Sequence, residues 1–374
     1  MKNVVYIRPV VISVLLFFSI AGHGWAKMVI ARSSDHFLPA SSLSALAISI
    51  ARGAETVYLS LAMSADNQVI LLGDTAVNEL TNAAELFPEK IRDDGSYHVM
   101  DFTLAELQQL SLVSTSHTIT APPRPALVPL PQIRLATLDD AFNLIKTMQN
   151  NLGRRIEIIA EIKKSWQYRH EARDISRTVI ERCRQHGYTS HDSGIYLASY
   201  DPEELQRIDK ELFAQLGVDL KIFQLIEKNS GLEIKRLERG RWLNYNYDWI
   251  YTKFGLKAVS TYADMLSLMP DFLVSETGDL LHQEYIEDAH LLGLKIIIHP
   301  IDQLAESLPP FAISFESLLE FCLFTAGADG LVTGKDLFVR EFIKGQLPDS
   351  SNGKKNKTTI ELLLENVKKQ QQNN

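Results

Sequence analysis

The sequence predicts an α/β protein, a closed (β/α)8 barrel of the TIM type with an insertion after the second strand. Three observations lead to this fold class. Short apolar runs typical of buried strands alternate with amphipathic helical patterns along the chain, and such alternation is typical of a parallel sheet covered by helices. Eight of these strands remain once one hairpin is set aside, which is the number that closes such a barrel. The chain of 374 residues is 45% hydrophobic, which allows a large core.

The first 26 residues have the pattern of a secretory signal peptide. Lys2 and Arg8 come before an apolar run from Val10 to Ile20. Small residues then flank Trp25, which is typical of a cleavage site, here after Ala26. The apolar run is shorter than the ~20 residues that a spanning helix needs, so an uncleaved anchor is the less favoured alternative. The residue directly after the cleavage site is Lys27 and not a cysteine, so we expect no lipid attachment there. We therefore expect a periplasmic or secreted protein with no membrane span after cleavage.

Charge and cysteine content narrow the function classes further. The formal net charge is -8, and it becomes -10 once Lys2 and Arg8 are removed with the signal peptide. An acidic chain of this kind is a poor candidate for binding nucleic acid. Cys183 and Cys322 are the two cysteines. An exported protein could pair them or bury both as free thiols, because sequence spacing does not show whether they meet.

The expected elements follow one another in a regular order. The first strand is expected at Met28–Ala31, and a helix follows at Leu43–Ala51. Val57–Leu61 and Val69–Leu72 lie too close together for a parallel crossover, which needs about a dozen residues, so we interpret Val57–Leu72 as a hairpin. Further strands are expected at Ile156–Ile162, Ile195–Tyr200, Ile222–Ile226, Phe272–Ser275, Leu294–His299 and Gly330–Thr333. Further helices are expected at Asp174–His186, Glu203–Leu216 and Glu284–Leu292.

Two segments do not fit the barrel pattern. Residues 75–139 are too many for a simple connection and contain the proline-rich stretch APPRPALVPLPQ (121–132), so we expect an insertion that folds over one barrel end. The tail, residues 346–374, is rich in Lys, Asn and Gln, and we expect it to be disordered. The barrel domain is therefore expected to span residues 27–345.

Several stretches of the chain resemble the periplasmic glycerophosphodiester phosphodiesterases, over most of residues 28–337. The most specific are LFPEKIRDDGSYHVMDFTLAEL (86–107), EIK (161–163), HGYT (186–189), LASYDPEEL (197–205), LNYNYDW (243–249), IHP (298–300) and GADGLVTG (327–334). The resemblance implies a TIM-barrel hydrolase that converts glycerophosphodiesters to glycerol 3-phosphate and an alcohol. It further implies two histidines for proton transfer and a Ca²⁺ or Mg²⁺ ion held by carboxylates, chemistry that suits phosphoryl transfer to water.

The chain departs from the family pattern where the resemblance implies proton transfer. The first strand in the family usually ends in His-Arg-Gly, whereas this chain has Arg32-Ser33-Ser34. Gly73 stands where the second family histidine is expected, although Asp74 is kept. We therefore assign no catalytic residue, and the two family positions are occupied by Arg32 and Gly73.

The chain also departs from the pattern at the implied metal ligands. The family Glu-x-Asp becomes Tyr58-Leu59-Ser60, and a phenol and a hydroxyl are weak ligands for a hard cation. The expected Thr-Asp near the last strand becomes Thr333-Gly334. Glu161 is then the one family metal ligand that remains. We expect no metal cofactor, and Ca²⁺ or Mg²⁺ only if the protein is an active enzyme with a rearranged site.

The residues that survive at the strand ends are candidates for a substrate pocket. They are Arg32, Asp74, Lys163, Asp201 and His299. Glu161 and Lys163 share a strand face, and they either pair with each other or contact a ligand. Arg32 is predicted to replace the missing cation by a direct pair with Glu161, the alternative being that it turns into solvent.

The leading hypothesis is an exported member of this family that has lost catalysis and kept a ligand-binding or scaffold role. Its ligand would be a glycerophosphodiester or a related phosphate ester, and no protein partner can be named from the sequence. One alternative is an active phosphodiesterase with a rearranged site. The other is a structural, partner-binding protein that uses the surface of the insertion.

Overall fold

The structure is a computed structural model. It describes residues 27–32, 38–39, 41–112, 133–275, 279–302, 308–309 and 312–346. The expected signal peptide, the proline-rich stretch 121–132, Ser33, Ser34 and the tail beyond residue 346 lie outside the described residues.

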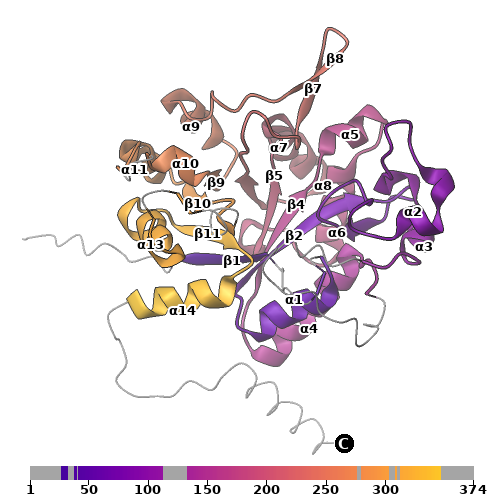
Figure 1. Ribbon diagram of the computed structural model, residues 1–374, viewed down its shortest axis with the longest axis horizontal. Helices are drawn as coiled ribbons and strands as arrows, with labels where there is room; N and C mark the ends of the chain where they lie inside the picture. The colour runs from indigo at the N-terminus through magenta and orange to yellow at the C-terminus, as the bar shows by residue number, and fades with distance from the viewer. Residues whose placement is uncertain are drawn as a thin grey trace, which may run out of the picture.

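Parallel strands close into a barrel, which confirms the predicted TIM-type (β/α)8 fold (Figure 1). Around the barrel the strand order is β1, β11, β10, β9, β6, β5, β4, β2, and β2 pairs with β1 again to close the ring. The strands are β1 (Met28–Arg32), β2 (Thr56–Met63), β4 (Glu157–Ile162), β5 (Ile195–Ser199), β6 (Lys221–Gln224), β9 (Met265–Leu268), β10 (Lys295–Ile298) and β11 (Gly330–Thr333).

The predicted hairpin after the second strand is also confirmed. Strand β3 (Val69–Leu71) runs antiparallel to β2, with Met63 opposite Val69 and Leu61 opposite Leu71. Asn67 in the connecting turn has a φ of 59°, a left-handed conformation that asparagine tolerates better than most residues. The hairpin leaves β4 as the next strand of the barrel.

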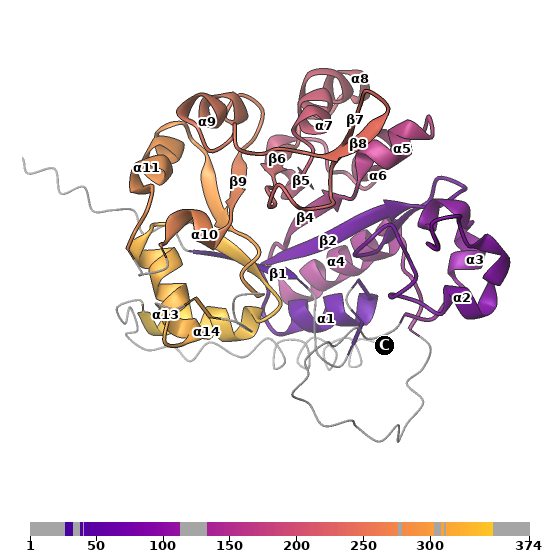
Figure 2. The same ribbon diagram turned by 45° about the horizontal axis from the view of Figure 1, so that its top comes forward.

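Helices cover the outside of the strands, and four of them lie where the sequence predicts (Figure 2). These four are α1 (Leu43–Ala51), α6 (Ile175–Gln185), α11 (Gln283–Leu291) and the segment predicted at Glu203–Leu216. That last segment is α7 (Pro202–Arg207) and α8 (Phe213–Leu216) joined by the π-helical turn η4 (Ile208–Leu212). Further helical elements are α4 (Leu138–Leu152), α5 (Ser165–His170), α9 (Lys253–Val259), α13 (Phe315–Glu320), α14 (Asp336–Gln346), η3 (His191–Ser193) and η5 (Phe321–Thr325).

The strand predicted at Phe272–Ser275 is wrong. The barrel strand is β9 (Met265–Leu268), and the helix α10 (Pro270–Leu273) follows it directly. The apolar run continues from the strand into the helix, so hydrophobicity alone does not separate them. Pro270 marks the division, because proline has no N–H for a sheet and suits the first turn of a helix.

Two apolar cores result from the period of two along the strands. One fills the barrel interior and includes Ile30, Tyr58, Ile159, Phe223 and Val332. The other packs the outer strand faces against the helices and includes the alternate residues of the same strands, such as Leu59, Ile158 and Leu331. Tyr58 belongs to the interior cluster. Ser60 lies two residues further along β2 and therefore on the same inner face, nearer the carboxyl ends of the strands.

Residues 75–112 pack beside the β2–β3 hairpin around a small apolar cluster of their own. Their elements are α2 (Ala83–Leu86), η1 (Pro88–Lys90), η2 (Val99–Asp101) and α3 (Leu104–Leu107). The cluster joins Phe102 and Leu107 to Ala62 and Ile70 of the hairpin. Figure 1 shows this group at one side of the barrel.

A second hairpin, β7 (Lys235–Glu238) and β8 (Arg241–Asn244), forms a separate two-stranded sheet and projects from the barrel (Figure 1). This hairpin was not predicted from the sequence, because each of its strands has only four residues and half of these residues are charged.

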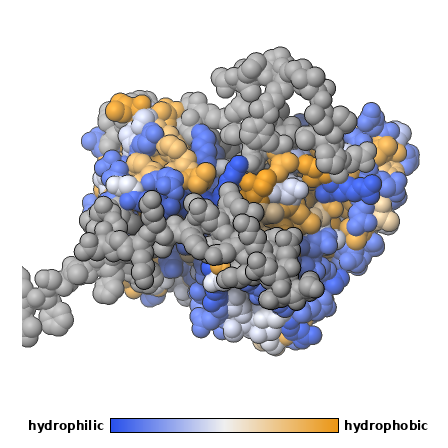
Figure 3. All heavy atoms as spheres, turned by 90° about the horizontal axis from the view of Figure 1, so that it is seen from below, coloured by the Kyte–Doolittle hydropathy of each residue, from blue (hydrophilic) through white to orange (hydrophobic). Residues whose placement is uncertain are grey.

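Among the residues that the structure describes, no helix is both long enough and apolar enough to cross a bilayer. Seen from the side on which α1, α4 and α14 lie, the described surface carries both hydrophilic and apolar patches (Figure 3). Cys183 and Cys322 are buried as separate thiols, and burial raises the pKa of each to about 12.

Candidate functional site

A small cavity of about 50 Å³ lies at the carboxyl ends of β1 and β2. Its lining includes Arg32 at the end of β1, Tyr58 and Ser60 of β2, and Gly73 just after β3. These four residues stand at the positions where the resemblance implies catalytic histidines and metal-binding carboxylates. The fold therefore brings the four altered positions to one place, although they are separated by up to 41 residues in sequence.

The amino-terminal end of helix α1 also borders the cavity. Ser41 and Ser42 line it, and the Ser42 side chain caps the helix by accepting a hydrogen bond of 3.2 Å from the backbone N–H of Ala45. Neither serine was predicted from the sequence as a site residue. The signal available for them is a serine directly before a helical pattern, which is typical of a helix N-cap.

Glu161 lies beside the cavity with both carboxylate oxygens bound by this chain's own donors. The Ser60 hydroxyl donates to Oε2 at 2.7 Å, and the Lys163 ammonium donates to Oε1 at 3.1 Å. Glu161 is only 2% exposed. Burial alone would raise the pKa of this carboxyl, but Lys163 and Ser60 outweigh burial and lower it. Glu161 is therefore held as a carboxylate inside the barrel.

Lys163 bridges Glu161 to a second carboxylate, that of Glu233. Burial opposes the charge of Lys163, and the two carboxylates outweigh it, so the pKa of the ammonium is raised. Burial raises the pKa of Glu233, against the influence of Lys163. Glu233 lies in the loop between β6 and β7, and the sequence analysis missed it because a loop has no periodicity that would assign its side chains to a site.

The predicted direct pair of Arg32 with Glu161 is not among the ion pairs and hydrogen bonds that the described residues form. Glu161 forms an ion pair with Lys163, which directly follows β4, and this pairing is one of the two alternatives that the sequence left open. Desolvation lowers the pKa of the Arg32 guanidinium, and the electrostatic influence of Tyr58, Glu161 and nearby groups outweighs it, so the pKa is raised. Arg32 thus stays cationic at the cavity while its side chain remains accessible to solvent.

His299 follows β10 at the same end of the barrel and is 3% exposed. Its Nε2 lies 3.1 Å from the Tyr200 hydroxyl, and its buried Nδ1 has no hydrogen-bond partner among the residues that the structure describes. The ring centroid of Tyr58 is 6.0 Å away. Burial, and then the positive charge of Arg32, lower the pKa of His299 to about 3. The imidazole is therefore neutral at physiological pH and cannot act there as a protonated general acid.

Asp74 and Asp201, two other pocket candidates, are bound within the protein itself. The Asp74 carboxylate accepts hydrogen bonds of 2.6 Å from the Lys164 ammonium and 2.5 Å from the backbone N–H of Thr75. Burial would raise the pKa of Asp74, but Lys164 outweighs burial and lowers it. Asp201, which is 0% exposed, caps helix α7 through the N–H groups of Glu203 and Glu204.

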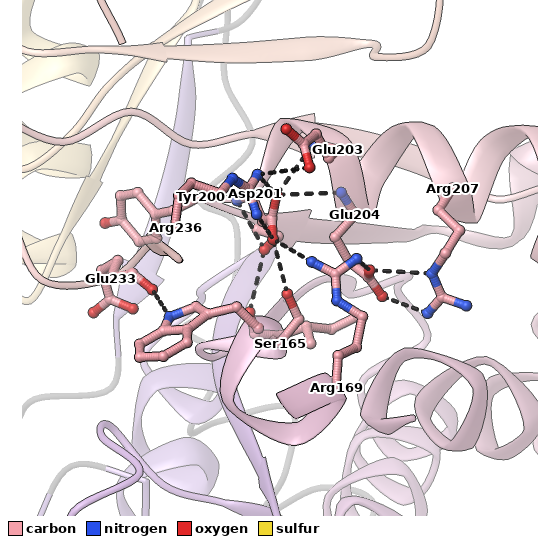
Figure 4. Close-up of polar contacts among 12 residues, drawn as sticks. Ser165, Arg169, Tyr200, Asp201, Glu203, Glu204, Arg207, Glu233 and Arg236 are labelled. Carbon is pink, nitrogen blue, oxygen red and sulfur yellow. Dashed lines mark hydrogen bonds and ion pairs between the residues drawn. The ribbon is translucent and has the colours of Figure 1, made fainter. Parts of the chain in front are cut away.

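Asp201 is also the centre of an ion network, drawn in Figure 4. Arg169 from α5 contacts its carboxylate at 3.0 Å, and Arg236 from the projecting hairpin contacts it at 2.8 Å. Glu204 pairs with Arg169 at 2.7 Å and with Arg207 at 2.6 Å. The network ties the β7–β8 hairpin and α5 to the end of β5. These contacts give Asp201 a structural role that requires no bound ligand.

The residues present do not suit the divalent cation that the family resemblance implies. Calcium takes about six to eight oxygen ligands and favours several carboxylates. Glu161 has both oxygens occupied, and the nearest charged donor to it is an ammonium group. Among the residues that the structure describes, no group of three or more His, Cys, Asp and Glu side chains could hold a metal ion. No step through a metal ion is therefore derived for this site.

The fold and the cavity define a class of protein: a (β/α)8 barrel with a cavity at the carboxyl ends of its strands, where such barrels carry their active sites. Within that class, the chain belongs to the glycerophosphoryl diester phosphodiesterase family, whose sequence profile matches residues 32–302.

Two relatives support the same assignment along nearly the whole chain. A glycerophosphodiester phosphodiesterase of Haemophilus influenzae is 30% identical over 330 residues, which cover 85% of this chain and 90% of the relative. One of Treponema pallidum is 27% identical over 327 residues, covering 84% of this chain and 91% of the relative. The family and these relatives indicate hydrolases of phosphodiesters.

Solved structures of low sequence identity share the fold. A glycerophosphodiester phosphodiesterase from Agrobacterium tumefaciens matches with a TM-score of 0.51 at 14% identity, over 84% of this chain and 99% of that one. A phosphodiesterase from Oleispira antarctica, solved in complex with the product sn-glycerol-3-phosphate, matches with a TM-score of 0.52 at 16% identity, over 85% and 96%. At these identities the likeness concerns the barrel alone.

Proposed function

We propose that this protein is an exported member of the family that binds a glycerophosphodiester or a related phosphate ester and does not hydrolyse it. One observation carries the proposal. The cavity that contains the altered positions Tyr58, Ser60 and Gly73 also contains a cationic Arg32 and the amino-terminal end of α1. Groups suited to holding an anion are present, whereas groups suited to cleaving it have been replaced.

Two features of the cavity favour a phosphoryl group. The amino-terminal end of a helix presents N–H groups and partial positive charge, and it is a common site for phosphate. Arg32 adds a full positive charge, and a guanidinium can bind two phosphate oxygens with parallel hydrogen bonds. A related phosphodiesterase binds sn-glycerol-3-phosphate in its solved structure, which is the kind of ligand proposed here.

Hydrolysis would need a proton donor, a proton acceptor and charge neutralisation at the phosphoryl oxygens. Gly73 has no side chain, and burial raises the pKa of Tyr58 well above its ordinary value, so its phenol stays protonated. His299 is neutral and buried. Each general acid or base that is lost typically costs about 10²–10⁴-fold in rate.

Export is proposed on the amino-terminal sequence alone. Lys2, Arg8 and the apolar run that follows them favour secretion and cleavage after Ala26. Cell fractionation of a tagged full-length chain tests this part separately from ligand binding, because a cytoplasmic protein could still bind the same ester.

Calorimetric titration of the chain beginning at Lys27 tests binding. We expect sn-glycerol-3-phosphate or glycerophosphocholine to bind, and Arg32→Gln to weaken binding at least tenfold. Lys210→Gln removes an equal charge from the exposed side of the π-helical turn η4 and should leave the affinity unchanged within about twofold. Equal affinity of the parent and Arg32→Gln, or no binding of either ester to the parent, would reject the proposal.

A further inference from the structure

A second and larger cavity lies at the opposite, amino-terminal end of the barrel strands. It is an open cavity of about 730 Å³, and its lining includes the starts of β1, β2 and β4 at Met28, Thr56 and Glu157. The end of α1, the end of α4 and helix α14 border it. These three helices lie side by side along one side of the barrel in Figures 1 and 2. We call it the basal cavity.

Cations dominate the lining of the basal cavity. Six basic residues line it, and the acidic residues in the lining are Glu55 and Glu157. The basic ones are Lys27, Arg52, Arg154, Arg155, Arg340 and Lys344. This concentration of positive charge contrasts with the formal net charge of -8 of the whole chain. A concave surface that gathers charge of one sign raises the local concentration of ligands of the opposite sign.

Neutral backbone carbonyls hold several of these cations in place. The Arg154 guanidinium donates to the carbonyls of Ile50 and Ala54, each at 2.7 Å. The Lys27 ammonium donates to the carbonyl of Ala328 at 2.8 Å, and Arg155 donates to the carbonyl of Asp192. A carbonyl positions a cation without cancelling its charge. Among the described residues, Lys27, Arg154 and Arg155 make no ion pair with a carboxylate.

Two of the other basic residues in the lining are paired with carboxylates. Arg340 pairs with Asp336 at 2.8 Å, and Lys344 pairs with Glu341 at 2.7 Å. Burial lowers the pKa of Lys27, against the influence of Asp329. Burial lowers the pKa of Arg154 too, and the positive charge of Arg340 lowers it further, against the influence of Glu55. The cations around the basal cavity therefore repel one another, and a bound anion would relieve this repulsion.

We propose that the basal cavity is a second binding site, which takes a phosphate-bearing anion. Phosphate oxygens match the planar donors of arginine, and two of the five N–H donors of Arg154 serve the carbonyl contacts. The anion is either a free phosphorylated small molecule or the headgroup of an anionic lipid, since both present the same chemistry. The inference goes beyond the proposed function, because this cavity lies at the other end of the barrel from Arg32.

The test measures binding of pyrophosphate by calorimetry in an Arg32→Gln background, so that the first cavity does not contribute. Arg155→Gln combined with Lys344→Gln removes two cavity charges and spares Arg154, whose contacts stabilise the end of α1. We expect pyrophosphate to bind the background protein and the double substitution to weaken it at least tenfold. Lys210→Gln with Lys257→Gln removes the same charge from exposed positions and should change the affinity less than twofold.

A second arm distinguishes the two sources of phosphate. The same proteins are sedimented with vesicles of phosphatidylcholine alone and of phosphatidylcholine with phosphatidylglycerol. Binding to the anionic vesicles that is lost on the double substitution supports the lipid headgroup, and pyrophosphate binding without vesicle binding supports the soluble ligand. Absence of both, or binding that the double substitution leaves unchanged, would overturn the proposal. Circular dichroism and urea unfolding of each variant show that the fold is intact.

Discussion

The Ser60 hydroxyl donates a hydrogen bond of 2.7 Å to the Glu161 carboxylate across neighbouring strands of the barrel. Strands β2 and β4 pair in a register that sets these two residues opposite each other. The family resemblance implies a carboxylate at the position of Ser60, and a metal ion between it and Glu161. Here a hydroxyl and the Lys163 ammonium satisfy Glu161 instead. Glu161 therefore takes part in an internal ion pair at the position where the resemblance implies a metal ligand.

Removing the ammonium tests how much this ion pair contributes to stability. Lys163→Met leaves Glu161 and Glu233 buried without their cation, and breaking such a buried pair costs about 3–5 kcal/mol of unfolding free energy. Urea unfolding at pH 7 measures the loss. Lys210→Met, at an exposed position, should cost less than about 0.5 kcal/mol.

The loss should depend on pH in a defined direction. In the parent, Lys163 lowers the pKa of Glu161 in the folded state. The stabilisation that the ion pair gives is therefore present above the pKa that Glu161 has in the unfolded chain. It is lost as the pH falls through the lower pKa that Glu161 has in the folded protein. In Lys163→Met, burial without a cation raises the pKa of Glu161 instead, and protonation relieves the cost. The deficit of the variant should therefore shrink between pH 7 and pH 5. A deficit of equal size at both pH values would contradict this account.

Introducing carboxylates at positions 58 and 60 should create a cation site. Tyr58→Glu with Ser60→Asp brings two negative charges next to Glu161, so the variant should be less stable than the parent in the absence of metal. Millimolar calcium should then raise its melting temperature, because ligand binding to the folded state stabilises it. The parent should show no such rise. A calcium-dependent rise in the parent that Glu161→Gln abolishes would show that the parent already binds the ion.

The network at Asp201 should matter for stability rather than for ligand binding. Asp201→Asn removes the charge that Arg169 and Arg236 share, and the expected loss is about 3 kcal/mol or more of unfolding free energy. Affinity for sn-glycerol-3-phosphate, measured where the variant is folded, should stay within about twofold of the parent. A variant of parental stability with lost affinity would instead place Asp201 in the ligand site. Glu341→Gln, which removes an exposed ion pair, is the matched control.

Glu227 should give the fold a separate pH dependence. Burial raises the pKa of its carboxyl to about 7, so the folded state holds a proton that the unfolded state releases above about pH 4.3. Stability should then fall as pH rises between these values. Because the carboxyl is partly accessible to water, we expect about 1–2 kcal/mol rather than the full linkage value. Urea unfolding of the parent and Glu227→Gln from pH 4.5 to 8 checks this, and equal slopes for both would contradict it.

The barrel could be predicted from sequence because its signals are local. Buried strands and amphipathic helices each have a period that the chain displays, and the short gap between Val57–Leu61 and Val69–Leu72 requires a hairpin. The strand at Met265–Leu268 was missed because an apolar helix follows it without an intervening polar turn. Local periodicity does not resolve two adjacent apolar elements of different type.

The candidate site could be predicted only in part, since its contacts depend on three-dimensional register. Sequence identified the altered positions Arg32, Tyr58, Ser60 and Gly73, and the structure places them around one cavity. Sequence left open whether Lys163 pairs with Glu161 or contacts a ligand, and it predicted Arg32 as a direct partner of Glu161. A residue two positions along the same strand lies on the same face, which favours Lys163 over a residue on another strand.

The measurement that tests the central claim most directly is release of glycerol 3-phosphate from glycerophosphocholine or glycerophosphoethanolamine by the purified chain beginning at Lys27. It is made with millimolar calcium or magnesium present, beside an active relative assayed under the same conditions. We predict no release above the rate without protein, although the esters bind. Release at a rate comparable to that of the relative, and lost on Arg32→Gln or His299→Gln, would contradict the account and establish a working phosphodiesterase with a rearranged site.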